Sequence, residues 1–122
     1  MIKILIVEDD ENIREIFSRM VETLGHEAVG CSNGRQAWDR LCAAADIDLI
    51  ITDVKMPEMD GRELVSLVRR HHAFGQLPVL IISGVAGEDE LGDLTDGGLT
   101  FFLPKHVTIR EMESYIGERL GV

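Results

Sequence analysis

The sequence predicts an α/β fold, a doubly wound five-stranded parallel sheet with helices on both faces. Short, continuously apolar runs alternate five times with segments whose apolar residues recur every three or four positions. Strands that are apolar throughout are typical of parallel sheets buried on both faces. The 122 residues, 45% of them hydrophobic, suffice for the core of one domain. We therefore expect residues 1–122 to form a single domain, with no output domain in this chain.

The first half of the chain contains three predicted strands, at residues 2–7, 27–31 and 49–52. The helix after the first strand has one apolar face and ends at Gly25, a residue type that commonly closes helices. Its apolar residues are Ile13, Ile16, Phe17, Met20, Val21 and Leu24. Ser32 and Asn33 can cap the next helix, in which we assign Trp38 to core packing.

The second half contains two predicted strands, at residues 79–82 and 100–103. The helix before them has an inward face made of Leu64, Val65 and Val68. Thr108 and Glu111 have the spacing of a capping box, in which each side chain accepts a hydrogen bond from a free amide of the first turn. The last helix therefore begins at this point, and its apolar stripe consists of Met112, Ile116 and Leu120.

Residues 84–98 form the weakest part of the pattern. They include five glycines and five acids, with few sizeable apolar residues between them. Each interior glycine costs a helix about 1 kcal/mol relative to alanine. We expect any helix in this segment to be short or mobile.

The composition excludes several classes of function. Acids outnumber bases by 22 to 12, a formal charge of −10, which repels nucleic-acid phosphates and anionic lipids. We expect no direct nucleic-acid or membrane partner; a divalent cation or a basic protein surface is the natural one.

The sequence also bears on where the protein acts. The first apolar run ends in acids, not in a signal-peptide cleavage site, and no run is long enough to span a bilayer, so we expect the protein to be cytoplasmic. Cys31 and Cys42 are too few for a disulfide framework and are expected to stay reduced.

Chemically useful side chains follow four of the predicted strands. They are Glu8 and Asp9 after the first strand, Asp53 after the third, Ser83 after the fourth and Lys105 after the fifth. In open parallel sheets ligands bind beyond the carboxyl ends of the strands, so these residues are expected to meet in one pocket. Asp10, which follows the same first strand, is assigned instead to capping the helix after it.

Three crowded acids would repel one another unless their pKa values rise or a cation lies among them. An all-oxygen site of this kind suits Mg²⁺, which also pairs well with phosphate. One carboxylate can then attack a phosphoryl group and become an aspartyl phosphate. Asp53 is the preferred nucleophile, because its strand is expected to lie between the Glu8 strand and the Ser83 strand. The Lys105 ammonium and the Ser83 hydroxyl can contact the phosphoryl oxygens.

Four segments, in this order and at this spacing, resemble the receiver domain of two-component response regulators. They are Ile4 to Asp10, Asp53 to Gly61 with Met56, Pro57, Met59 and Asp60, Ile82-Ser83-Gly84, and Phe102-Leu103-Pro104-Lys105. The resemblance covers essentially the whole chain. It implies the flavodoxin-like strand order 2-1-3-4-5. It also implies a signalling protein that catalyses only its own phosphorylation and dephosphorylation.

The resemblance also assigns a role to each site residue. Asp53 would receive a phosphoryl group from a histidine kinase or a histidine phosphotransfer protein. Asp9, Asp53 and the backbone carbonyl of Lys55 would hold Mg²⁺ directly, and Glu8 would assist through water. Ser83 would hydrogen-bond the phosphoryl group and Lys105 would pair with it.

The same resemblance implies a switch. Phe102 would turn inward as Ser83 moves, whereas Phe101 should point to the opposite face of the sheet. Residues 84–98, the strand at 100–103 and the last helix would then form a face that controls an unknown downstream partner.

The chain departs from the family pattern in two ways, and two further positions influence how long an acyl phosphate lasts. His106 stands where the family usually has a proline, often after a cis bond, which leaves the isomer of the Lys105–His106 bond open. The glycine-rich residues 84–98 suggest that phosphorylation orders this segment. Lys55 and Val85 are poor at orienting a water molecule, so we expect slow autodephosphorylation.

The same residues bear on three other interpretations of the chain. A metal-dependent phosphohydrolase with an aspartyl nucleophile generally needs a second acid two residues later, where this chain has Lys55. A flavin-binding domain needs a phosphate loop after the first strand, and Glu8, Asp9 and Asp10 would repel phosphate. A receiver-like interaction module that works without phosphorylation is the main alternative, although the complete set of acids, Ser83 and Lys105 argues against such a loss.

Overall fold

The computed structural model describes residues 1–84 and 99–122. The elements are β1 (Lys3–Val7), α1 (Glu11–Thr23), β2 (Glu27–Cys31), α2 (Gly34–Ala43), β3 (Leu49–Thr52), α3 (Gly61–Arg70), β4 (Val79–Ser83), β5 (Thr100–Pro104) and α4 (Ile109–Leu120). Each strand lies within one residue of its predicted bounds. Residues 85–98 fall outside the described residues. They include Val85 and nearly all of the segment that was expected to be short or mobile and to become ordered on phosphorylation.

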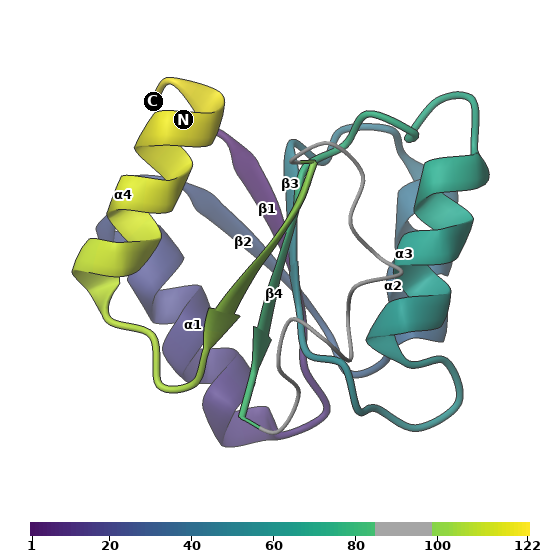
Figure 1. Cartoon of the computed structure of the whole chain (residues 1–122), viewed down its shortest axis with the longest axis horizontal. Coiled ribbons are helices and arrows are strands. Elements are labelled where there is room, and N and C mark those ends of the chain that lie inside the picture. The colour runs from purple at the N-terminus through teal and green to yellow at the C-terminus, as the bar shows by residue number, and fades with distance from the viewer. Residues whose placement is uncertain (85–98) are drawn as a thin grey trace.

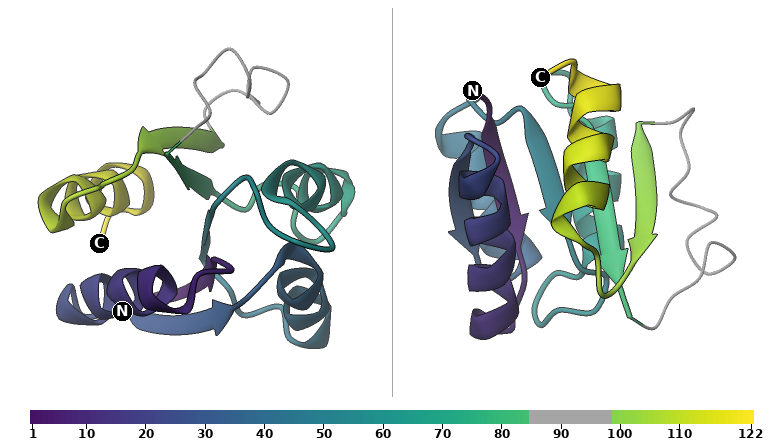
Figure 2. Two further views of the ribbon diagram at one scale, coloured as in Figure 1. Left: turned by 90° about the horizontal axis from the view of Figure 1, so that it is seen from below. Right: turned by 90° about the vertical axis from the view of Figure 1, so that its left-hand side faces the viewer.

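The five strands form one parallel sheet in the order β2-β1-β3-β4-β5, which confirms the predicted fold class. Helices α1 and α4 cover one face of the sheet, and α2 and α3 cover the other (Figures 1 and 2). Among the described residues no helix is both long and apolar enough to cross a membrane.

Alternation along the strands divides the core into two layers. In β1, Leu5 and Val7 pack toward α2 and α3, whereas Ile4 and Ile6 pack toward α1 and α4. Every residue of the central strand β3 is buried. The strand that carries Asp53 at its end is therefore held rigidly from both sides and both faces.

Side chains close the amino ends of the helices as their sequence positions predict. Asp10 caps α1 by accepting hydrogen bonds from the amides of Asn12 and Ile13, and Asn33 caps α2. Thr108 and Glu111 form the capping box of α4. These caps satisfy amides that a helix leaves unpaired at its first turn, and they confirm the helix starts expected from the sequence.

The remaining structural expectations concern single side chains. Trp38 is half-buried against the core between α2 and α3. Cys31 and Cys42 are both free thiols, the first buried and the second exposed. Phe102 packs on the α2 and α3 side of β5, whereas the ring of Phe101 lies 5.5 Å from that of Tyr115 on α4. The two phenylalanines therefore face opposite sides of the sheet, as predicted.

Candidate functional site

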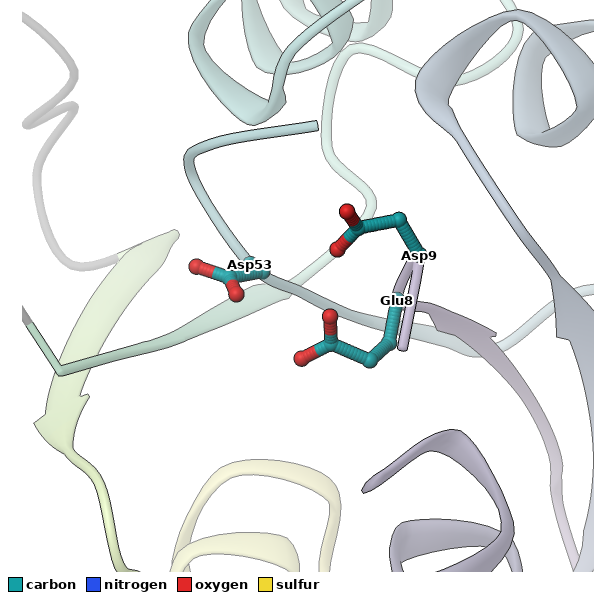
Figure 3. Close-up of side chains that lie close together, drawn as sticks. All are labelled: Glu8, Asp9 and Asp53. Carbon is teal, nitrogen blue, oxygen red and sulfur yellow. The ribbon is translucent and has the colours of Figure 1, made fainter. Parts of the chain in front are cut away.

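Three carboxyl groups lie side by side at the carboxyl ends of β1 and β3 (Figure 3). The register pairs Val7 with Thr52, and the Asp53 amide donates to the Val7 carbonyl at 3.1 Å. The residues that follow, Glu8 and Asp53, therefore lie at one level of the sheet. One oxygen each from Glu8, Asp9 and Asp53 lie within 4.8 Å of one another. Glu8 is 1% exposed and Asp53 9%, whereas Asp9 is open to solvent.

Lys105 contributes a cation to this cluster from the end of β5. Its Nζ lies 2.8 Å from Asp53 Oδ2 and 3.1 Å from Glu8 Oε1. Its amide donates to the Ser83 carbonyl at 3.1 Å, and the Lys105–His106 peptide bond is cis. Burial acts to lower the pKa of Lys105, but the hydrogen bonds and charges of Asp53 and Glu8 outweigh it and raise the pKa. The lysine is therefore firmly protonated, and it bridges two of the three acids.

Glu8 has the most perturbed environment of the three acids. Burial, followed by a hydrogen bond with Asp9, raises the pKa of Glu8 to about 7, and the charge of Asp53 acts in the same direction. The amide of Asp10, which donates to Glu8 Oε2 at 3.2 Å, and the ammonium of Lys105 oppose this rise. The pKa of Glu8 is thus raised, as expected for acids that lie together without a cation among them, and burial is the main cause.

Two further predicted residues lie on the neighbouring strands β4 and β5. Ser83 ends β4, is 2% exposed and pairs in register with Pro104. Phe102 pairs with Ile81 and is half-buried. The structure thus brings Ser83 and Lys105 to the sheet edge where the acids lie, and it places Phe102 directly beneath that edge.

The oxygen-rich cluster fits a divalent cation. Glu8 Oε1 is buried and, apart from its ion pair with Lys105, accepts no hydrogen bond from the described residues. The carboxylate of Asp9 is open to solvent. The side chain of Lys55 is exposed. Hard oxygen donors with solvent access on one side are what Mg²⁺ requires.

Sequence reasoning missed Arg14. Its guanidinium donates to the backbone carbonyl of Glu8 at 2.8 Å. Its side chain lies along Gly30 of β2, where a β-carbon would come within 3.4 Å of Arg14 Cδ. The arginine therefore secures the backbone that carries Glu8 and Asp9. Arg14 follows Glu8 by six residues and lies near the start of α1. This short separation was the feature of the sequence that could have indicated the contact.

The edge of the sheet thus carries an acid triad, a bridging lysine and a buried serine, on a doubly wound parallel sheet. The family model for the response regulator receiver domain matches residues 4–117. The chain therefore belongs to the response regulator receiver domain family, whose members are signalling proteins.

Individual relatives support this assignment. The chemotaxis protein CheY1 of Helicobacter pylori is 32% identical over 120 residues, which cover 98% of this chain and 97% of that protein. The receiver domain of a signal transduction histidine kinase from Syntrophus aciditrophicus superposes with a TM-score of 0.87 at 30% identity, covering 99% of this chain and 91% of that one. The chemotaxis protein CheY4 of Vibrio cholerae has a TM-score of 0.86 at 28% identity, covering 98% and 99%. This chain is similar to full-length chemotaxis receivers and to a kinase-linked one.

Proposed function

We propose that the chain is the phosphoacceptor of a two-component phosphorelay and that Asp53 receives the phosphoryl group. The observation that carries the proposal is the contact of Lys105 Nζ with both Asp53 and Glu8, at 2.8 and 3.1 Å, beside the open carboxylate of Asp9. A phosphoryl group on Asp53 would find an ammonium already in place.

The proposed reaction is transfer from a phosphohistidine of a histidine kinase or a histidine phosphotransfer protein. A carboxylate oxygen of Asp53 forms a bond to phosphorus while the bond between phosphorus and the donor's histidine nitrogen breaks. The electron pair of that bond returns to the imidazole. The Val54 amide, which donates to Asp53 Oδ1 at 2.6 Å, and Lys105, which donates to Oδ2, hold the carboxylate in one orientation before it attacks.

Asp9, Asp53 and the Lys55 backbone carbonyl would hold Mg²⁺ directly, with Glu8 acting through water. When bound, the ion supplies positive charge that offsets the negative charge of the transferring group. Lys105, which contacts Asp53 and Glu8, supplies a further unit of positive charge. The Ser83 hydroxyl can donate a hydrogen bond to a phosphoryl oxygen, because it ends the strand next to β3.

The phosphorylated state would be read at β5 and α4. Ser83 and Phe102 lie on paired strands, so a displacement of Ser83 toward the phosphoryl group can be followed by Phe102 turning inward. On the other side of β5, Phe101, Tyr115 and Arg119 line an open groove against α4. We propose that this face, together with the segment before β5, engages the downstream protein, and that the chain acts in the cytoplasm.

The direct test is intact mass after incubation with a small-molecule phosphodonor and Mg²⁺. We expect one added phosphoryl group on the native chain, and none on Asp53→Asn or in the presence of a chelator. An unmodified native chain, folded and supplied with Mg²⁺, would contradict the proposal and favour an interaction module that works without phosphorylation.

The lifetime of the adduct tests a finer part of the proposal. Lys55 has a cationic side chain and cannot act as a base toward water, so we expect slow hydrolysis of the acyl phosphate. A time course of the adduct mass after removal of the phosphodonor measures this rate. A lifetime of only seconds would refute it.

A further inference from the structure

The loop between β3 and α3 carries Lys55, whose carbonyl is a proposed ligand of the metal. Its first anchor is the start of α3. The Gly61 amide donates to the Val54 carbonyl at 2.8 Å. A β-carbon at Gly61 would collide with the carbonyl oxygen of Asp53. Close approach of these two backbones fixes the chain immediately after Asp53.

The second anchor comes from a different part of the sequence, the junction of β2 and α2. The Gly34 amide donates to the Met59 carbonyl at 2.9 Å, and a β-carbon at Gly34 would collide with that carbonyl oxygen. Asn33 Nδ2 donates to Glu58 Oε2 at 3.1 Å. Asn33 is only 7% exposed, and its Oδ1 accepts a hydrogen bond from the Gln36 amide at 2.8 Å. The oxygen of this side chain therefore caps α2, while its nitrogen holds the loop.

Glu58 adopts a backbone conformation that glutamate rarely takes. Its φ is +64°, and among the described residues no other non-glycine residue has a positive φ. The left-handed region is uncommon for side chains without a local hydrogen bond, and it persists where the surroundings hold it. The contact between Asn33 and Glu58 provides such support.

We propose that Asn33, Gly34 and Glu58 are positioning residues of the metal site. The two anchors hold Val54 on one side and Glu58 and Met59 on the other, so that residues 55–57 span a short fixed gap. The carbonyl of Lys55 lies within that gap. Releasing the second anchor lets the carbonyl move away from the acids without altering Glu8, Asp9 or Asp53. This inference rests on the proposed function, because it concerns the metal that assists phosphoryl transfer.

The test is calorimetric titration of the full chain with Mg²⁺, with no phosphodonor present. Asn33→Ser retains an oxygen that can cap α2 but lacks the amide donor. Glu58→Ala removes the acceptor. Glu58→Gln retains an acceptor oxygen and removes the charge, so it is the matched control for lost electrostatic attraction. Asp46→Asn, at the opposite end of the sheet, is the control for an unrelated surface change.

We expect Asn33→Ser and Glu58→Ala each to raise the Mg²⁺ Kd about 3- to 10-fold, at the lower end of what supporting residues contribute to metal sites. Glu58→Gln and Asp46→Asn should stay within about twofold of the native Kd. Asn33 and Glu58 act through one contact. The double variant Asn33→Ser with Glu58→Ala should therefore have a Mg²⁺ Kd no higher than that of the single variant that binds Mg²⁺ less tightly.

An unchanged Kd in Asn33→Ser, with or without reduced stability, would overturn the inference, since a purely structural contact predicts that result. Absence of Mg²⁺ binding by the native chain would overturn it as well. The intact-mass experiment separates this outcome from the fate of the proposed function. If the native chain takes no phosphoryl group while the Kd values differ as expected, the proposed function fails and the positioning role stands.

Discussion

The two ends of the sheet use the same side-chain types for opposite purposes. At the carboxyl end, Lys105 Nζ lies 2.8 Å from Asp53 and 3.1 Å from Glu8. At the amino end, Lys3 Nζ lies 2.6 Å from Asp46. By contact distance alone the two lysine–aspartate pairs are alike. Their burial and the charges around them separate a reactive site from a surface ion pair.

At the amino end the charges are balanced and hydrated. Arg40 donates to both oxygens of Asp46, at 3.0 and 3.2 Å, and Lys3 adds a third contact. These hydrogen bonds, that of Arg40 first, hold the pKa of Asp46 well below its usual range. Lys3 also lies 3.6 Å from Glu27, so two bases face two acids at the surface. Nothing in this arrangement favours a further cation.

At the carboxyl end the acids outnumber the base and two of them are buried. Glu8 has a raised pKa, the opposite direction to Asp46, because burial there is not offset by enough positive charge. An excess of buried negative charge costs stability and attracts a divalent cation. The comparison shows that a functional site of this kind can be distinguished by the direction of its pKa shifts as well as by its residue types.

The largest expected effect comes from removing each lysine in turn. Lys105→Met leaves Asp53 and Glu8 without their cation. We expect it to lower the free energy of unfolding of the metal-free chain by about 2 kcal/mol near pH 8, less than for a fully buried ion pair. Lys3→Met should produce no measurable change, because its partners Asp46 and Glu27 are open to solvent and Asp46 keeps its contact with Arg40. Urea denaturation of both variants measures the difference.

Mg²⁺ should stabilise Lys105→Met more than it stabilises the native chain, because the charge of the metal ion can offset the acids that have lost the Lys105 ammonium. Equal losses in the two lysine variants would contradict the contrast between the ends of the sheet. So would a Lys105→Met chain that Mg²⁺ leaves unaffected.

Replacing Glu8 by glutamine tests the same contrast between the two ends of the sheet by removing an acid of the cluster in place of its lysine. The substitution removes a carboxylate that burial disfavours, so we expect the metal-free chain to gain on the order of 1 kcal/mol at pH 8. The same change should weaken Mg²⁺ binding by about tenfold. Denaturant midpoints and calorimetric titration measure the two effects. A stabilised variant with native Mg²⁺ affinity would exclude Glu8 from the metal site.

The pH dependence of stability follows from the same group. The folded-state pKa of Glu8 is about 7, above its ordinary value of 4.5, so the folded chain binds this proton more tightly than the unfolded chain. Its contribution to stability is fully present below pH 4.5 and is lost as the pH rises through about 7. We expect the difference in unfolding free energy between the native chain and Glu8→Gln to change in this window. A difference that does not change with pH would contradict the raised pKa of Glu8.

These contrasts also show what the sequence could predict. Apolar runs placed the strands, and the parallel arrangement then brought Glu8, Asp9, Asp53 and Lys105 together, because strand ends in such a sheet share one edge. The contact between Asn33 and Glu58 joins residues 25 positions apart on two loops, and no periodicity marks it. The degree of burial that shifts Glu8 also arises from packing. The sequence left open the isomer of the Lys105–His106 bond, which is cis.

The smallest expected effect is that of Asp46→Asn, and it tests the amino end alone. The single oxygen of an asparagine, placed where Asp46 Oδ2 lies, can still accept hydrogen bonds from Arg40 Nη2 and Lys3 Nζ, so the charge and one hydrogen bond from Arg40 Nη1 are lost at an exposed position. We expect the denaturant midpoint to shift slightly or not at all near pH 7, and any difference from the native chain to shrink as the salt concentration rises, because salt screens the charge pair that the variant lacks. A large loss of stability would mean that this surface cluster secures the starts of β1 and β3 as firmly as Lys105 secures their ends. The two ends of the sheet would then differ in chemistry but not in their importance to the fold.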